Sequence, residues 1–590
     1  MNRALALARH AAPAQIAAYL GLAVLGGLAP LALAWLTKLL VDGLADRLMR
    51  WPQAAVLATA LAVSGIVIAL VPHASRYLRI EIDRRIRTVA TERLYAAMDR
   101  LVGLRRFEDP AFLDRVQVAR SSGVTAPGMV VDGGLGMVQA ALTLTGFAGT
   151  LFLLSPWIAA VVVLAAVPGL LAELSLSRRR ARMVVNVGQA ERRELFYASL
   201  LTDTVAAKEI RLFGAGPYLW RRMAAEIRTI NTAHRRVDRR ELTVQIGLSL
   251  LGAALAGALL LWSVRAALDG MLTVGDVALV FAAVAAVQGA LAGLVTQMVS
   301  MHQALLLFGH YVAVVAAEPD LPVRHPARPA PALRHGVELR DVWFRYADDQ
   351  PWVLRGVDLV LPAGRSTALV GLNGAGKSTL VKLLCRLYDP TRGVVLWDGV
   401  DLRDLDPAEL RRRIRAVFQD ATRYDLTARE NIELGDLTAI GDTSRVERAA
   451  RRAGVHDVLS GLQMGYETPL TRMFHDTITG VELSGGQWQR LALARGLVHE
   501  QPDLLILDEP SSALDAEAEH EIHERLRDYR RGRASLLVSH RLGVVREADH
   551  IVVLAEGRPV ERGNHDELVA LGGAYARLFA LQASGYRVAA

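Results

Sequence analysis

The stretch Gly371–Thr379, GLNGAGKST, decides the fold of the second half of the chain because it fits the pattern G-x-x-x-x-G-K-[ST]. It follows the strand-like STALV and precedes the helix-like TLVKLLCRLY, which is the context that a phosphate-binding loop requires. Glycines let backbone N–H groups wrap around phosphates, Lys377 can reach the β- and γ-phosphates, and Ser378 can ligate Mg²⁺. The residues expected to bind ATP are Gly371, Asn373, Gly374, Ala375, Gly376, Lys377, Ser378 and Thr379.

Lysine is scarce in this chain, which makes the lysine of the loop informative. Lys38, Lys208, Lys377 and Lys382 are the only four, whereas arginine is abundant. A lysine kept where arginine is otherwise preferred indicates that a compact point charge is needed rather than a planar fork.

The stretch Leu504–Pro510, LLILDEP, is an apolar strand that ends in two carboxylates. Asp508 is expected to hold Mg²⁺ through water, and Glu509 to polarise the attacking water as general base. A strand that ends in acid can also serve only as the N-cap of a helix. The phosphate-binding loop upstream favours the catalytic interpretation.

Three further polar residues stand at strand-like positions. His540 ends ASLLVSH and can contact a γ-phosphate, whereas Gln419 ends AVFQ and can reach both Mg²⁺ and the attacking water. Tyr346 in VWFRYADD can stack on an adenine ring. Alone, His540 is more often an ordinary surface histidine, and Tyr346 also fits an exposed position on an edge strand.

Composition places part of the chain in a membrane. Its 590 residues exceed a single core, and 52% of them are hydrophobic, with a mean hydropathy of +0.25. The net charge of +8 comes with arginine clusters beside apolar stretches, which favours a positive-inside membrane protein without a nucleic-acid partner. Cys385 is the only cysteine, so disulfides within the chain and Cys-rich metal sites are excluded.

Six uncharged apolar stretches of membrane-spanning length precede residue 310. The first is too long for the apolar region of a signal peptide and lacks a convincing cleavage site, so we expect a retained helix. Arginine-rich segments follow the second and the fourth, which places those segments and both termini on the cytoplasmic side. The expected spans are Ile16–Leu36, Ala54–Val71, Gly133–Leu154, Trp157–Ala172, Leu242–Val264 and Val277–His302.

Each arginine-rich segment is predicted to extend its flanking spans as helices that meet at a cytoplasmic tip. The tips are RRFEDPAFLDRV, 105–116, and AAKEIRLFGAGPYLW, 206–220. Both mix aromatic and charged residues, which fits either a solvated turn or a docking surface. A proline-rich linker, 318–336, then separates a transmembrane domain, 1–317, from an α/β domain, 337–590.

The order of the motifs, from Tyr346 through the phosphate-binding loop, Gln419, LSGGQ, LLILDEP and SALD to His540, resembles the nucleotide-binding domain of ATP-binding cassette (ABC) transporters. With six helices and two intracellular hairpins before it, the chain resembles an ABC exporter half-transporter of the B-type (type IV) fold. That fold is an α-helical transmembrane bundle followed by an α/β ATPase domain. The resemblance covers nearly the whole chain.

The resemblance implies that two chains assemble, each lending its LSGGQ to ATP held by the loop of the other. The residues that would serve the partner's nucleotide are Ser484, Gly485, Gly486, Gln487 and Asp515. It further implies ATP hydrolysis coupled to transport, a homodimer in preference to a heterodimer, and hairpin tips that dock on the ATPase domains. The setting expected is a bacterial inner membrane, with the nucleotide-binding domain in the cytoplasm.

We expect export of a hydrophobic or amphipathic compound, with a lipid flippase or an importer of exporter architecture as alternatives. Trp488 after LSGGQ resembles bacterial exporters found beside peptide natural-product pathways. Soluble ABC ATPases of ribosomes or DNA lack apolar spans, and a peptidase-containing exporter needs an N-terminal catalytic cysteine. The expected spans hold no charged residue, which leaves these hydrogen-bonding groups for a cavity: Gln139, Gln245, Gln288, Gln297 and His302.

Overall fold

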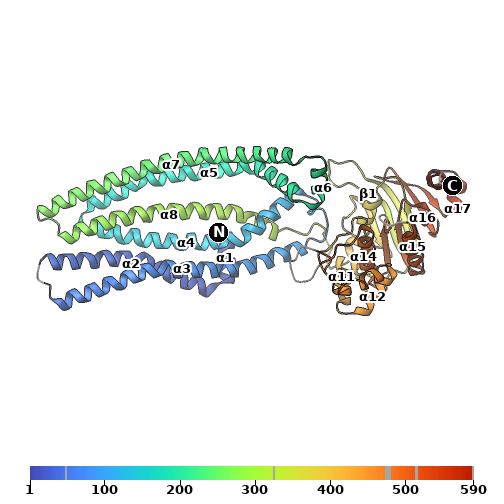
Figure 1. Cartoon of the computed structure of the whole chain (residues 1–590), viewed down its shortest axis with the longest axis horizontal. Helices are drawn as coiled ribbons and strands as arrows, with labels where there is room; N and C mark the ends of the chain where they lie inside the picture. Colours follow the sequence, from blue (N-terminus) through green and yellow to red (C-terminus); the bar gives the residue numbers. More distant parts are fainter. Residues whose placement is uncertain (47–48, 323–325, 472–479, 512–515, 588–590) are drawn as a thin grey trace. The chain divides into compact units, whose positions relative to one another are not determined.

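A computed structural model describes residues 1–46, 49–322, 326–471, 480–511 and 516–587 (Figure 1). These residues form two compact units. The helical unit comprises Met1–Asp99 and Ala111–Ala317, and the α/β unit comprises Arg100–Pro110 and Glu318–Ala590. Residues 100–110, which include the start of the first hairpin tip, therefore cluster with the α/β unit, although the flanking helices belong to the helical unit.

The helical unit consists of long apolar helices, as expected for a membrane domain. Five of the described helices, α2, α3, α4, α7 and α8, are long and apolar enough to cross a membrane, and α5 begins with a shorter apolar stretch, Pro156–Gly169. The predicted fold class, a helical bundle followed by an α/β domain, is confirmed. The helices are α1 (Asn2–Ala11), α2 (Pro13–Ala45), α3 (Trp51–Asp99), α4 (Pro110–Leu154), α5 (Pro156–Thr202), α6 (Thr204–Leu212), α7 (Gly216–Leu268) and α8 (Val274–Val315).

The arginine-rich segments continue the membrane helices without a break. α3 runs from its apolar first half through the polar segment to Asp99, and α5 and α7 lie side by side (Figure 1). The dipeptide SP separates α4 from α5, with Ser155 as the N-cap and Pro156 at the first helical position, where its missing N–H costs nothing. The short helix α1 buries Ala4, Leu7 and Ala8, which lie on one helical face.

The α/β unit contains two sheets. The larger has the order β10-β9-β3-β8-β7-β6 and is parallel except for the pair β9 and β10; the smaller, β2-β1-β4-β5, is antiparallel. The strands are β1 (Gly336–Phe344), β2 (Leu354–Pro362), β3 (Ser366–Val370), β4 (Arg392–Trp397), β5 (Val400–Asp401), β6 (Ile414–Val417), β7 (Leu504–Asp508), β8 (Ala534–Val538), β9 (His550–Ala555) and β10 (Arg558–Gly563).

Helices cover these sheets and complete three hydrophobic clusters: one around β1, β2 and α9, one around α14, and one between β3, β9 and the C-terminal helices. The helices are α9 (Lys377–Leu384), α10 (Pro407–Arg413), α11 (Ala428–Glu433), α12 (Thr443–Arg452), α13 (His456–Ser460), α14 (Gly485–Leu497), α15 (Ala516–Arg530), α16 (Leu542–Val545), α17 (His565–Leu571) and α18 (Ala574–Arg587), with 3₁₀ turns at Leu402–Asp404, Leu437–Ala439 and Gly465–Glu467.

The parallel strands β3, β8, β7 and β6 are neighbours, and all four end at the same edge of the sheet. Strands β7 and β8 are buried at every position, which explains their continuous apolar sequences. Polar residues that follow these strands therefore meet at one edge, which is where open α/β sheets bind ligands.

Candidate nucleotide site

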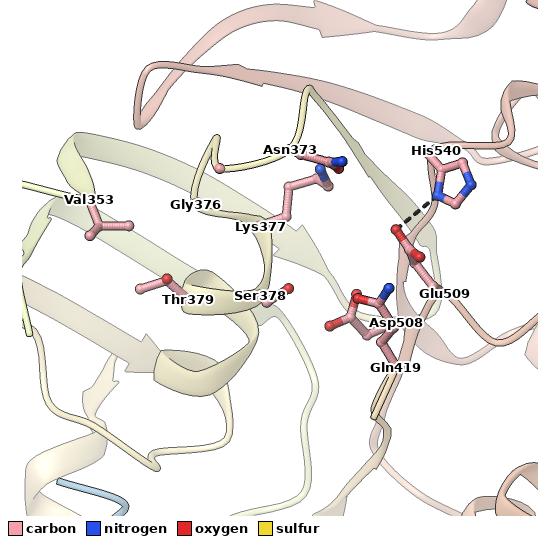
Figure 2. Close-up of a pocket in the computed structure, with 11 residues that line it drawn as sticks. Val353, Asn373, Gly376, Lys377, Ser378, Thr379, Gln419, Asp508, Glu509 and His540 are labelled. Carbon is pink, nitrogen blue, oxygen red and sulfur yellow. Dashed lines mark hydrogen bonds and ion pairs between the residues drawn. The ribbon is translucent and has the colours of Figure 1, made fainter. Parts of the chain in front are cut away.

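A cavity of about 580 Å³ lies at the carboxyl edge of the parallel sheet (Figure 2). The loop between β3 and α9 forms one wall, and the ends of β6, β7 and β8 supply the opposite one. The structure thus brings together most of the predicted site residues. The cavity is lined by Val353, Asn373, Gly374, Gly376, Lys377, Ser378, Thr379, Gln419, Asp508, Glu509 and His540.

Two glycines of the loop meet different steric demands. Gly376 has φ 102°, in the left-handed region, and caps the N-terminus of α9. A Cβ at Gly371 would stand 2.3 Å from the backbone oxygen of Leu554, so that position excludes any side chain. The loop can therefore wrap around phosphates at the positive end of α9.

Lys377 is buried beside the loop that it belongs to. Its Nζ donates hydrogen bonds to the backbone oxygens of Gly371, at 2.8 Å, and Leu372, at 3.1 Å. Burial lowers the pKa of Lys377, and the nearby carboxylates of Glu509 and Asp508 act in the opposite direction. Lys377 and the two carboxylates line the same cavity, so phosphates held there would lie near both.

Asp508 ends β7 and is buried. Burial and the charge of Glu509 raise the pKa of Asp508 to about 6, although Ser378 and Lys377 act to lower it. A cation bound beside Asp508 would offset both the burial and the repulsion, and so stabilise the charged carboxylate. Gln419 lies beside Asp508, and Ser378 faces them (Figure 2), so three oxygen donors converge in a set that suits Mg²⁺.

Glu509 projects into the cavity from a strained backbone position. Its φ is 51°, an uncommon value for a residue other than glycine. His540 Nδ1 lies 2.9 Å from Glu509 Oε1, and Gln489 on α14 donates a hydrogen bond to the backbone oxygen of Glu509. Histidine and carboxylate therefore form a pair directed at the cavity (Figure 2).

Tyr346 does not line this cavity. It lines a neighbouring one of about 860 Å³ within the α/β unit, and its hydroxyl lies 3.0 Å from Thr379 Oγ1. Lys382 Nζ lies 5.3 Å from the centre of the Tyr346 ring. Val353, just before β2, lines the phosphate cavity and was not anticipated, since an isolated valine carries no motif.

The four signature residues stand apart from the site residues of the same chain. Ser484 caps α14: its hydroxyl accepts from Gln487 N, and Gln487 Oε1 accepts from Ser484 N at 2.9 Å. None of Ser484, Gly485, Gly486 and Gln487 lines the described cavity. Trp488 is buried in the core around α14. Asp515 lies outside the described residues.

The first tip is bound to the α/β unit. Lys382 donates to Glu108 Oε1 at 2.7 Å, and Tyr388 donates to the other oxygen of this carboxylate. Leu104 N bonds to Leu387 O, and the Leu104 side chain packs on the core of the unit. Burial acts to raise the pKa of Glu108, but hydrogen bonds from Lys382 and Tyr388 bring it below its usual value.

The second tip exposes its apolar side chains. The helix α6 has no buried residue, although Asp203 caps its N-terminus. Val205, Leu212 and Phe213 are 77%, 78% and 72% exposed. Such high exposure of three large apolar residues on one tip is typical of a surface that another domain or subunit covers.

Comparisons with known proteins agree with this architecture. The family model described as ABC transporter matches residues 354–512. The cyclolysin secretion/processing ATP-binding protein CyaB of Bordetella pertussis is 46% identical over 253 residues, 43% of this chain and 34% of the relative. The chain thus spans about a third of that protein's length.

Two other similarities extend into the helical unit. An ATP-dependent lipid A-core flippase of Alkalilimnicola ehrlichii is 35% identical over 411 residues, 68% of this chain and 66% of the relative. The solved structure of a bacterial Atm1-family ABC exporter with ATP bound superposes with a TM-score of 0.85 at 25% identity, covering 96% of this chain and 99% of the other. The chain belongs to the ABC transporter family and is a half-transporter of exporter type, with a multi-pass membrane domain fused to an ATP-binding domain.

Proposed function

We propose that two copies of this chain form an ATP-driven exporter that moves a hydrophobic or amphipathic compound, such as a peptide natural product, out of the cytoplasm. The observation that carries the proposal is the cavity that gathers a phosphate-binding lysine, a buried carboxylate and a Glu–His pair. We place the protein in a bacterial inner membrane, with the α/β unit in the cytoplasm because arginine concentrates on that side.

Hydrolysis follows from the residues of the cavity. Lys377 and the loop N–H groups hold the phosphates, while Glu509 accepts a proton from the attacking water. His540 orients the Glu509 carboxylate through the 2.9 Å contact and can reach a γ-phosphate. Ser378, Gln419 and Asp508 would hold Mg²⁺, which when bound neutralises the charge of the phosphates.

The dimer supplies what one chain lacks at its own cavity. Ser484, Gly485, Gly486 and Gln487 present backbone N–H groups at the start of α14, but they do not line the cavity of their own chain. An N-terminus of this kind binds phosphate. In the proposed homodimer, it closes over the nucleotide of the partner subunit, and Asp515 contributes at the same interface.

Coupling between hydrolysis and transport would pass through the two hairpin tips. The first tip is joined to the α/β unit of its own chain through Glu108 and Leu104. The exposed apolar residues of the second tip would pack on the α/β unit of the partner. Closure of the two α/β units would then move the membrane helices as rigid bodies.

A lipid flippase is the second candidate, favoured by the similarity to lipid A-core flippases along 68% of this chain. Both activities use the same nucleotide chemistry, and the molecule that moves decides between them. Reconstituted protein therefore has to be offered both a labelled apolar peptide and a labelled lipid.

The test uses purified full-length protein in liposomes, with ATP outside and either labelled compound. Wild type should hydrolyse ATP and accumulate the peptide, whereas Glu509→Gln should bind ATP and hydrolyse it about 10²- to 10⁴-fold more slowly. Glu556→Gln is the matched control, because Glu556 also has a positive φ, 48°, but is exposed in the turn before β10. Normal turnover in Glu509→Gln would contradict the assignment, and movement of lipid alone would favour the flippase.

A further inference from the structure

The histidine loop, residues 539–541, joins β8 to α16 and presents His540 to the nucleotide cavity. Strand β8 is buried at every position, which fixes the place where the loop begins. The His540 side chain is 51% exposed, and its ring contacts Glu509 (Figure 2). Packing alone does not fix a half-exposed ring, so the position of His540 depends on the backbone that presents it.

The side-chain amide of Gln582, on the C-terminal helix α18, binds the two peptide groups that follow His540. Its Nε2 donates to His540 O, and its Oε1 accepts from Leu542 N at 2.8 Å. Leu542 begins α16, where backbone N–H groups have no partner within the helix, and the N-cap residue Arg541 makes no capping hydrogen bond with its side chain. Gln582 therefore supplies the partners that this turn of the backbone needs.

This double contact requires a side chain that donates and accepts at the same time. The carbonyl of His540 needs a donor and the N–H of Leu542 needs an acceptor, and a primary amide carries one of each on a single planar group. A carboxylate at position 582 would keep the acceptor but place negative charge against the carbonyl of His540. An apolar side chain would leave both backbone groups unpaired, which is costly.

Helix α18 is itself anchored, so Gln582 extends from a fixed support. Tyr575, two helical turns earlier on the same face, is fully buried, and its hydroxyl lies 2.8 Å from His565 Nδ1. Leu578 and Phe579 pack on the hydrophobic cluster between β3, β9 and the C-terminal helices. The apolar face of the helix therefore fixes the end of the chain from which the amide reaches the histidine loop.

A second support joins the histidine loop to the loop after β7. Glu519 on α15 accepts hydrogen bonds from the side chains of Arg541 and Ser511, the latter at 2.8 Å. Ser511 follows Glu509 by two residues, so the segments that carry Glu509 and His540 are tied together through α15. This support acts on the side chain of Arg541 and leaves the peptide groups of the histidine loop to be held from elsewhere.

We propose that Gln582 is a positioning residue for ATP hydrolysis, which holds the histidine loop so that His540 meets Glu509 and the γ-phosphate. Gln582 does not line the described nucleotide cavity, and its two contacts are with backbone of the loop and of α16. The proposal rests on the role of His540 in the proposed function and adds the C-terminal helix to the hydrolytic apparatus. This helix then controls the rate of hydrolysis and not the affinity for ATP.

The test measures steady-state hydrolysis of radiolabelled ATP and equilibrium binding of a fluorescent ATP analogue by the full-length protein in lipid nanodiscs. Gln582→Glu keeps the shape of the side chain but exchanges its donor for a second acceptor. It should lower kcat about tenfold, because small displacements of a catalytic group are costly. KM and the affinity for the analogue should change by less than about twofold, since Lys377 and the phosphate-binding loop are untouched.

Gln501→Glu is the matched control, because it makes the same chemical change at an exposed residue beyond α14. It should keep the wild-type kcat and KM. Gln582→Met is a second variant of similar length that cannot donate a hydrogen bond, so it should reproduce the loss of kcat and answers the question if Gln582→Glu fails to fold. Thermal unfolding of each purified variant identifies such a failure.

A double-mutant cycle separates positioning from a general loss of stability. His540→Ala removes the group that Gln582 positions, so Gln582→Glu should lower kcat no further in that background. A purely structural effect would lower kcat by the same factor with and without the histidine. The radiolabelled substrate keeps the slow residual hydrolysis of the His540→Ala variants measurable.

Wild-type kcat in the Gln582 variants, an equal loss of kcat with and without His540, or a loss of ATP affinity in place of the loss of kcat would each overturn the proposal. The same data test the proposed function separately. Normal hydrolysis by His540→Ala would contradict the role assigned there to His540, whereas impaired hydrolysis by His540→Ala with no effect of the Gln582 variants contradicts only this inference.

Discussion

The backbone of Glu509 is strained at the position from which its side chain enters the nucleotide cavity. Its φ of 51° is a conformation that costs of order 1–3 kcal/mol for a residue other than glycine. Glycine would relieve the strain, but it would remove the carboxylate that pairs with His540. Successive side chains of a strand point to opposite faces of the sheet. The left-handed backbone of Glu509, directly after β7, departs from this alternation and directs the side chain into the cavity.

Asp436 stabilises the helical part of the α/β unit through several hydrogen bonds. Its carboxylate lies 2.7 Å from His499 Nδ1 and from Arg445 Nη2, and it accepts from Thr438 N and Oγ1. Burial acts to raise the pKa of Asp436, but these bonds, that of His499 first, outweigh burial and lower it well below its usual value.

Asp436→Asn should therefore lower the thermal unfolding temperature at pH 7 by about 5 °C, since it removes charged hydrogen bonds worth about 1.5–3 kcal/mol. Because the folded pKa is depressed, this stabilisation is complete above the usual Asp value of 3.8 and is lost as the pH falls through the folded pKa. The difference between variant and wild type should shrink below about pH 4.

Scanning calorimetry of the full-length protein from pH 7 down to pH 3 checks the prediction. Asp528→Asn serves as control, because Asp528 is exposed and pairs only at 3.5 Å with Arg531; it should change the unfolding temperature little. A constant difference between Asp436→Asn and wild type at every pH would contradict the titration of Asp436.

The residues of the candidate nucleotide site were predictable to very different degrees. Lys377, Asp508 and Glu509 follow from motifs because phosphate chemistry demands fixed residue types at fixed spacing. Val353 contributes only shape, which leaves no pattern in a sequence.

At the scale of elements, the first hairpin tip is joined to the α/β unit by charge as well as by packing. Glu108→Lys and Lys382→Glu should each leave basal ATP hydrolysis in place but reduce its stimulation by substrate about fivefold, since a half-exposed pair is worth up to about 1 kcal/mol. The double exchange should restore stimulation, because it re-forms the pair in reverse. ATP hydrolysis with and without an apolar peptide measures the effect.

Asp114→Lys is the matched control, because it makes the same charge change on an exposed residue of α4. It should retain stimulation. If the double exchange is no better than the single ones, the ion pair does not transmit the coupling, and the packing of Leu104 becomes the leading contact.

The helical hairpins followed from the sequence, but their contacts did not. Polar extensions of apolar spans predict long helices, and α3, α4, α5 and α7 have that form. The sequence showed that the first tip mixes aromatic and charged residues, but not which of them make contacts. Leu104 and Glu108 make the contacts with the α/β unit that the structure describes. Which face of a short tip is used depends on the surface that it meets.

At the scale of the whole molecule, the proposed shared sites predict complementation. A chain with Lys377→Ala retains its signature, and a chain with Ser484→Arg retains its phosphate-binding loop. A mixed dimer of the two should therefore contain one complete site, whereas each variant alone contains none. Hydrolysis by purified mixed dimers should clearly exceed that of either parent.

The control places both changes in one chain and pairs that chain with wild type. This dimer has the same mutations, but each of its two shared sites lacks one element, so it should be nearly inactive. If instead the control is active and the first mixture is not, each site is built within a single chain.

Most of the architecture could be read from the sequence because its two halves obey different and simple patterns. Long uncharged stretches predict membrane helices, and short apolar runs between glycines predict parallel strands. What the sequence did not reveal is the division after Asp99, since the tip at 100–110 joins the α/β unit. Such a division depends on contacts between segments far apart in the chain.

The single cysteine has a practical consequence for measuring the movements of the two subunits during ATP hydrolysis. Cys385 is buried at the end of α9, and burial raises the pKa of its thiol to about 12, so it remains protonated and shielded from maleimide reagents. A cysteine introduced at an exposed position, such as Phe213 or Trp51, becomes the only reactive thiol in the subunit. Spin or fluorescent labels attached there can then report distances within the active dimer. No native cysteine has to be removed first.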